Sequence, residues 1–388
     1  MINKVVDTQQ TELEHFWQSL LHLNHGEKVC LHRYQPNEAH GMSYKDFYAQ
    51  AHCAAAYLME HGLNHGDSVV ILSGNTAEYL ILDQALQYLG AINITLPPTV
   101  SPEALLRICD RYEARFLFVP DAATMHAHGQ FSSLKPQLAA IVVGTDDLEG
   151  LETQKLIAFD RLVAIGKTAW REQAQSLKDR KRRVRPSDLY ALIFPDEGEN
   201  GDFEPLSFMA LLENVENAQK LYSGQPETAA ASFLPPYRIL HRTHAVYGSM
   251  MAQTPIWICL PEHLEQPFFS AVKPEVMFVA PPELTQVYTL LPSLMTKEGA
   301  SVQTAASAIG KAHEVLEKKA NAESQGKKNP ILNSLKYRFG NQKTYRKIKL
   351  ALGGKLVRIA CDHGKMDGMA TLLLQECGIQ IEQPKPFY

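Results

Sequence analysis

The hydrophobic positions near the start of the chain repeat at two different spacings. Residues 45–62 carry apolar side chains at helical spacing and end at a glycine, which predicts a helix that stops there. The run at 68–74 is short, apolar and β-branched, which is typical of a strand buried in a parallel sheet. Helical spacing returns at 77–89, and 91–96 again has the pattern of a strand.

The same alternation continues along the rest of the sequence. Further strands are predicted at 115–120, 139–144, 190–194, 256–260, 276–280 and 355–361, and further helices at 102–114, 208–221 and 369–378. Strands that alternate with helices indicate a doubly wound α/β fold. This class is the fold that we expect.

Two polar stretches interrupt the alternation. The basic run at 178–183 is interpreted as a solvated connector, which places a first α/β subdomain at 1–185 and a second at 186–388. Residues 296–330 are rich in Ala, Lys, Glu and Gln, and they predict a polar helical insertion within the second subdomain.

The overall composition limits the classes of function. With 45% hydrophobic and 21% charged residues among 388, the chain has the profile of an ordinary globular protein. Its net charge of −4 offers no general attraction to nucleic acid, so no nucleic-acid partner is expected. The first residues lack an apolar signal region, and no run approaches the ~20 residues of a membrane span. We therefore expect no transmembrane segment and a cytoplasmic location.

The cysteines are far apart and form no CxxC pair, so neither a zinc site nor a disulfide framework is expected. They are Cys30, Cys53, Cys109, Cys259, Cys361 and Cys377. Motifs of other enzyme classes, GxSxG, HExxH and GxGxxG, do not occur. No catalytic residue is assigned on these grounds.

Several ordered motifs resemble those of adenylate-forming enzymes. The opening of that family has a helix, a Gly-x-x-x-Gly-Asp turn, an Asn near a strand end and a Gly-Ala pair, and the matching residues here are Gly62, Gly66, Asp67, Val69, Asn75, Gly90 and Ala91. The segments 231–251, 272–288 and 345–364 are similar, in the same order, to motifs of long-chain acyl-CoA synthetases. The collinear order makes the resemblance more specific than any single motif.

The resemblance implies an N-terminal region of two packed βαβ-type subdomains with a smaller β-unit. It also implies a fatty acid–CoA ligase that uses ATP, Mg²⁺ and CoA. The sequence ends before the family's C-terminal lid domain would begin, so we expect the lid to be absent.

The phosphate-binding loop of that family departs furthest from the pattern. The corresponding stretch, 194–205, keeps Gly198 and Gly201 but has lost the hydroxyl residues. Carboxylates occupy it instead: Asp196, Glu197, Glu199, Asp202 and Glu204. Glu204 falls near the position where the family's loop has a lysine. A unit charge ~4 Å from a phosphate interacts with it by about 4 kcal/mol at an effective dielectric constant of 20, so replacing Lys by Glu turns an attraction into a repulsion of similar size. We therefore expect ATP to be repelled. The spacing does not meet a calcium-loop pattern, so no metal is expected.

Two further segments are candidate sites. The adenine-contacting segment of the family is replaced by the stretch Cys361, Asp362, His363 and Gly364, which introduces bulky and polar side chains. In the segment after residue 231, Tyr237 and Arg238 take the place of a histidine. An acyl or partner site is placed on Pro235, Tyr237, His241, Arg242 and Tyr247.

These departures predict a pseudoenzyme that acts as a binding or scaffolding partner without ATP-dependent ligation and without a cofactor. Its expected partner is another protein, such as an active acyl-CoA synthetase or an acyl carrier protein, or a fatty acyl group. One alternative is the acyl-binding half of a split ligase, completed by a partner chain, which would need ATP, Mg²⁺ and CoA. Another is a lipid-binding module whose tunnel walls are the apolar runs at 231–260 and 272–291.

Overall fold

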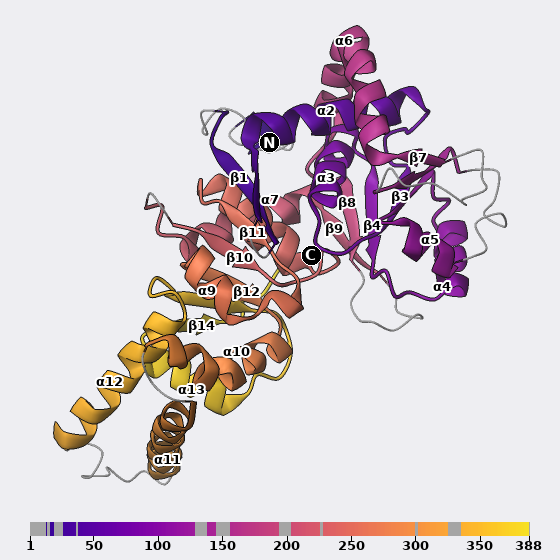
Figure 1. Ribbon diagram of the computed structural model, residues 1–388. Helices are drawn as coiled ribbons and strands as arrows, with labels where there is room; N and C mark the ends of the chain where they lie inside the picture. Colours follow the sequence, from indigo (N-terminus) through magenta and orange to yellow (C-terminus); the bar gives the residue numbers. More distant parts are fainter. Residues whose placement is uncertain are drawn as a thin grey trace, which may run out of the picture.

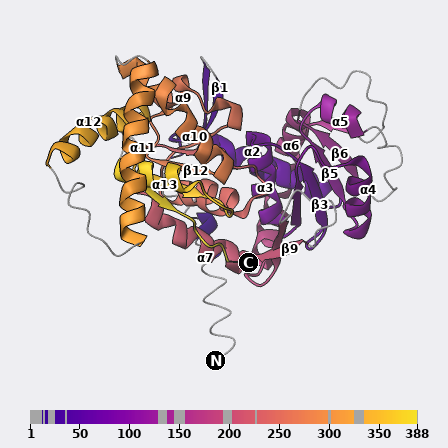
Figure 2. The same ribbon diagram turned by 90° about the horizontal axis from the view of Figure 1, so that it is seen from below.

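A computed structural model describes residues 13, 16–18, 26–35, 38–128, 138–144, 156–193, 203–225, 228–298, 302–324 and 335–387. Within these residues the chain forms two seven-stranded sheets flanked by helices, which confirms the expected α/β class (Figures 1 and 2). The six cysteines are free and buried.

The first sheet has the strand order β7-β6-β5-β3-β4-β8-β9 and is parallel except for β9, which runs antiparallel to β8. The strands are β3 (Ser68–Leu72), β4 (Ile92–Leu96), β5 (Phe116–Val119), β6 (Ala140–Val143), β7 (Leu156–Ala158), β8 (Leu189–Ile193) and β9 (Glu204–Ser207). The helices that follow or precede them are α2 (Tyr44–Glu60), α3 (Ala77–Leu89), α4 (Pro102–Arg111), α5 (Ala122–His128) and α6 (Phe159–Arg183).

Alternate residues of the first sheet face two different cores. Val69 and Ile71 pack with α2, α3 and α6, whereas Val70 and Leu72 pack with α4 and α5. This two-sided burial follows from the side-chain period of two and explains why the strands read as continuous apolar runs.

The second sheet has the order β14-β13-β12-β10-β11-β1-β2, in which only β2 is antiparallel to its neighbour. Its strands are β1 (Val29–Gln35), β2 (Glu38–Ser43), β10 (Ala230–Ser232), β11 (Ile256–Ile258), β12 (Val276–Val279), β13 (Arg358–Cys361) and β14 (Gln380–Glu382). The helices are α7 (Phe208–Ala218), the π-helix η3 (His241–Tyr247), α8 (Gly248–Met251), α9 (Gln266–Val272), α10 (Pro281–Leu294), α11 (Val302–Ser324), α12 (Leu335–Ala351) and α13 (Gly368–Glu376), with short 3₁₀ turns η2 (Gln219–Leu221), η4 (Pro261–His263) and η5 (Met295–Glu298).

One continuous core joins the two sheets. It contains Ile71 and Tyr190 from the first sheet, Ile256 and Phe278 from the second, and the inward faces of α3, α7 and η3 between them. The outer face of the second sheet is covered separately by α9 to α13. Because the middle helices belong to one core, the two sheets are held at a fixed separation, which positions the loops at their strand ends.

Two expectations about the polar stretches meet different outcomes. The basic run at 178–183 is not a connector, because it forms the last turns of α6, whose buried positions include Leu162, Gly166 and Leu177. Cations in the last turn of a helix are favoured by its dipole. The helical insertion near 296–330 is present in part as α11.

The division at residue 185 stays a prediction for the subdomains, but the sheets divide the chain differently. β8 and β9 follow that point and pair within the first sheet, while β1 and β2 precede it and pair within the second. The chain therefore crosses between the sheets more than once.

Candidate functional site

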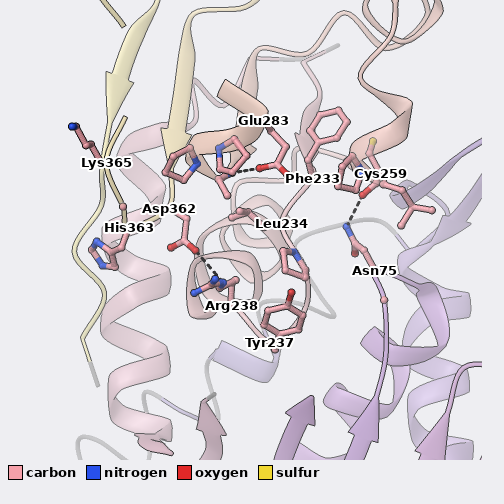
Figure 3. A pocket seen from close by; sticks show the side chains of 18 residues that line it. Asn75, Phe233, Leu234, Tyr237, Arg238, Cys259, Glu283, Asp362, His363 and Lys365 are labelled. Atoms are coloured by element: carbon pink, nitrogen blue, oxygen red, sulfur yellow. Dashed lines mark hydrogen bonds and ion pairs between the residues drawn. The ribbon is translucent and has the colours of Figure 1, made fainter. Parts of the chain in front are cut away.

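A cavity of about 580 Å³ opens where the parallel strands of the second sheet end (Figure 3). Its walls come from the segments that follow successive strands, together with two residues that follow β3: Gly74 and Asn75, 233–235, 237–238, 259–261, 280–283 and 362–365. In open α/β sheets the carboxyl ends of the strands are the usual place for a ligand.

Strand register brings these segments together although they are far apart in sequence. Ser232 pairs with Phe278 on one side and Ile258 on the other, and Val279 pairs with Cys361. The amide of Asn75 donates to the carbonyls of Ser232 (3.2 Å) and Cys259 (3.4 Å), which ties the first sheet to the rim of the cavity.

An ion pair spans the cavity wall. Arg238 Nε lies 3.5 Å from Asp362 Oδ2, and the Asp362 side chain is 7% exposed. The Asp362 amide donates to the Val279 carbonyl (2.8 Å), and Gln383 Nε2 donates to the carbonyls of Asp362 (3.1 Å) and Gly364 (3.0 Å). The aspartate is thus fixed by its backbone, so the pair holds the segment after β10 against the segment after β13.

Glu283 is the second carboxyl group of the cavity. It lies in the first turn of α10, where its Oε2 accepts a hydrogen bond from the Ala280 amide (3.0 Å). Burial raises the pKa of Glu283 above its ordinary value; the backbone hydrogen bonds and Arg238 lower this pKa, and Asp362 raises it. A carboxyl with a raised pKa contributes stability below its ordinary pKa and loses it as the pH rises through the raised value.

This arrangement predicts opposite effects of two substitutions on Glu283. Arg238→Met removes the cation that favours the carboxylate, so the pKa of Glu283 should rise further, whereas Asp362→Asn removes a like charge and should lower it. A carbon-13 NMR titration of the Glu283 carboxyl in the two variants would measure both shifts. Shifts of the same sign in both would contradict the arrangement.

The residues that the sequence assigns to an acyl or partner site divide into two groups. Pro235 and Tyr237 line the cavity, as do Asp362, His363 and Gly364 from the adenine segment. Cys361 is fully buried at the end of β13 and lies behind this wall. The rest of the set, His241, Arg242 and Tyr247, are buried in η3 and do not line the cavity.

The buried group supports the fold beneath the cavity. Burial, and then Arg242, lowers the pKa of His241 to about 3, so its ring is neutral, with Nδ1 2.9 Å from Ser232 Oγ. Arg242 Nε donates to the Pro236 carbonyl (2.7 Å), which fixes the turn that carries Tyr237. These residues therefore position the cavity wall and are not part of its lining.

A buried carboxylate on α3 is hydrogen-bonded to the last residue of η3. Asp83 is 1% exposed and accepts hydrogen bonds from the hydroxyls of Tyr247 (2.6 Å) and Tyr190 (2.6 Å) and from the Asn93 amide (2.5 Å). It also acts electrostatically on Arg242. Buried charges in proteins require such donors.

The acidic phosphate-loop residues Asp196, Glu197, Gly198, Glu199, Gly201 and Asp202 lie outside the described residues. Glu204 is described; it begins β9 at the edge of the first sheet and does not line the cavity. Among the described residues, no group of three or more His, Cys, Asp or Glu could hold a metal ion. Within the same part of the chain, no helix has the length and apolar character to cross a membrane.

Sequence reasoning missed Glu283 and the partnership of Arg238 with Asp362. Glu283 carries a recognisable signal, because an acidic residue three positions after a helix start is a common capping feature. The ion pair has no such signal, since 124 positions separate Arg238 from Asp362 in the printed sequence and only the strand order joins them.

Comparisons with known proteins agree with the architecture. Residues 22–194 match the family described as AMP-binding enzyme. A long-chain-fatty-acid–CoA ligase from Xenopus laevis is 23% identical over 342 residues, which is 85% of this chain and 44% of that protein. The chain thus spans about half the length of the relative that it matches.

Solved structures of adenylate-forming enzymes superpose over nearly the whole chain. An acyl-CoA synthetase from Brucella canis matches with a TM-score of 0.60 at 12% identity, covering 92% of this chain and 54% of that one. The adenylation domain of a carboxylate reductase from Mycobacterium chelonae matches with a TM-score of 0.64 at 14% identity, covering 95% and 56%. The chain therefore has the fold of the N-terminal part of an adenylate-forming enzyme and resembles the acyl-CoA synthetases in sequence.

Proposed function

We propose that this chain is a binding module derived from an acyl-CoA synthetase, which holds a fatty acyl group in the cavity and does not join it to CoA with ATP. The acyl group would arrive free or on a partner such as an acyl carrier protein. Such a module requires neither ATP nor Mg²⁺ nor CoA.

The observation that carries this proposal is the ion pair between Arg238 and Asp362. Both residues depart from the family pattern, the first at a histidine position and the second in the adenine segment. Their side chains satisfy each other across the wall where the resemblance places the nucleotide. The fixed carboxylate of Asp362 and the nearby Glu283 disfavour the several negative charges of a triphosphate more than the single carboxylate of a fatty acid, because like charges repel most strongly where water is scarce.

The size and walls of the cavity support an acyl ligand. Its volume of about 580 Å³ falls in the roughly 300–1,000 Å³ range of small-molecule sites. Phe233, Leu234 and Leu260 contribute apolar surface. An alkyl chain gains free energy from such surface without needing a hydrogen-bond partner.

Calorimetric titration with palmitate and, separately, with Mg-ATP tests the proposal. We expect palmitate to bind with a micromolar dissociation constant and ATP to show no binding at the same concentrations. Leu260→Trp should weaken palmitate binding, because Leu260 lines the cavity and a larger side chain there takes up part of its volume. The control Ile165→Trp, at an exposed position on α6, should leave binding unchanged.

Each result has a distinct meaning. Micromolar binding of ATP, or ATP-dependent formation of an acyl-adenylate, would contradict the proposal and favour the split-ligase alternative. A lack of palmitate binding would contradict the proposal that the cavity holds an acyl group. The chain would then be expected to act as a scaffold that binds another protein.

A further inference from the structure

The segment that contains α12 is a long stretch of uninterrupted positive charge. From Ser324 to Cys361 there is no aspartate or glutamate. The cations of this segment are Lys327, Lys328, Lys336, Arg338, Lys343, Arg346, Lys347, Lys349, Lys355 and Arg358. Because the whole chain carries a net charge of −4, the rest of the molecule is strongly acidic by comparison. Charge is therefore unevenly distributed along the sequence.

The structure places part of this charge on one side of a projecting helix. α12 extends outward from the body of the second sheet in both views, near α11 (Figures 1 and 2). Ile348 and Leu352 are buried against the core, which fixes the rotation of the C-terminal half of the helix. On its outer side, Lys343, Arg346, Lys347 and Leu350 are exposed at positions i, i+3, i+4 and i+7. We call these four residues the basic face.

The cations of the basic face are not neutralised by described carboxylates. None of the ion pairs that the structure gives between described residues includes Lys343, Arg346 or Lys347. Glu376 of α13 acts instead on Tyr345 and Cys377, closer to the core. Leu350, at 46% exposure, is one of the most exposed large hydrophobic residues of the described chain.

We propose that the basic face of α12 docks on an anionic phospholipid surface. Helices bind membrane surfaces through buried apolar side chains together with the attraction of Lys and Arg to anionic lipids, and each Lys or Arg near an anionic surface adds to the attraction. A nucleic acid would satisfy the three cations but would leave Leu350 without an apolar environment, and binding of an acidic protein is an outcome that the test below distinguishes.

Vesicle sedimentation with the full chain tests this interaction, which does not depend on the proposed acyl binding. The probes are vesicles of phosphatidylcholine alone and of an equimolar mixture with phosphatidylserine. The test variant replaces Lys343, Arg346 and Lys347 by glutamine. The control replaces Lys167, Arg171 and Lys178, exposed on α6, by glutamine, so both variants lose two lysines and one arginine.

We expect the unmodified chain to sediment with the mixed vesicles and not with phosphatidylcholine alone. The test variant should partition about a hundred-fold more weakly, whereas the control should partition like the unmodified chain. Leu350→Ser should weaken binding to the mixed vesicles less than the triple glutamine variant does. Its effect relative to the unmodified chain should persist at high salt, because the apolar contribution is not screened. All substituted positions are exposed, and a near-ultraviolet circular dichroism spectrum would confirm that each variant folds.

Equal losses in the test and control variants would show a general charge effect and overturn the proposal. So would a lack of sedimentation with anionic vesicles, even if the chain bound an acidic peptide or an oligonucleotide.

Discussion

Replacing Asp83 by asparagine is expected to lower the free energy of unfolding by about 3–5 kcal/mol. The carboxylate accepts hydrogen bonds from Tyr190, Tyr247 and Asn93 and faces no water. An asparagine amide would present two donors to groups that already donate, and Arg242 would lose the carboxylate that acts on it. Buried polar groups that lose their partners cost their full desolvation free energy.

Urea unfolding would measure the effect of Asp83→Asn as a lower midpoint with an unchanged slope. Asp179→Asn is a suitable control, because that exposed carboxylate accepts one hydrogen bond, from Gln175 (2.8 Å) on the same helix. Its effect should stay within about 0.5 kcal/mol. A loss below about 1 kcal/mol for Asp83→Asn would mean that the cluster is not held by this carboxylate.

Gly166→Ala is expected to lower the free energy of unfolding by about 2–3 kcal/mol. A Cβ atom at this position would lie 2.0 Å from the carbonyl oxygen of Cys53 and 2.7 Å from its carbonyl carbon. These are backbone atoms of α2, so the clash cannot be relieved by rotating a side chain. The helices α2 and α6 would have to move apart, which would loosen the core beneath the first sheet.

Thermal and urea unfolding of Gly166→Ala should be compared with Gly310→Ala on α11. An added Cβ at Gly310 would meet no atom within 4 Å. The helix preference of alanine over glycine should therefore stabilise that variant by up to about 1 kcal/mol. Equal effects of the two substitutions would show that the contact between α2 and α6 is not tight.

The sequence predicts the buried strands well because each is a short apolar run between helices. The expected strand at 68–74 corresponds to β3, and the expected helix at 77–89 is α3 with the same bounds. Edge strands are harder to predict. β9 has the sequence EPLS, in which a proline at an edge position leaves no strand-like pattern.

The wrong interpretation of residues 178–183 has a physical cause. A run of cations has the composition of a linker. In α6, however, these cations lie at the end of a long helix that is mostly exposed and has only a few buried residues. A local charge pattern cannot distinguish these two cases, because the difference lies in the core that the helix covers.

The candidate site was predictable only where it follows a motif. Pro235, Tyr237 and the segment 362–364 lie at strand ends that the family resemblance marks, and the structure brings them to one cavity. His241 and Arg242 share the same motif, yet the π-helix turns them into the core. The rotation of a helix about its axis depends on tertiary packing, which motif spacing does not encode.

The strand order also has a consequence for synthesis on the ribosome. β1 joins the second sheet through Leu31 and Ile256, so its neighbour β11 emerges much later in translation. The first sheet needs only strands up to β9, and it can close while the nascent hairpin of β1 and β2 still has an unpaired edge. Capture by a chaperone, or pairing with a second nascent chain, is therefore expected during this interval and at this hairpin.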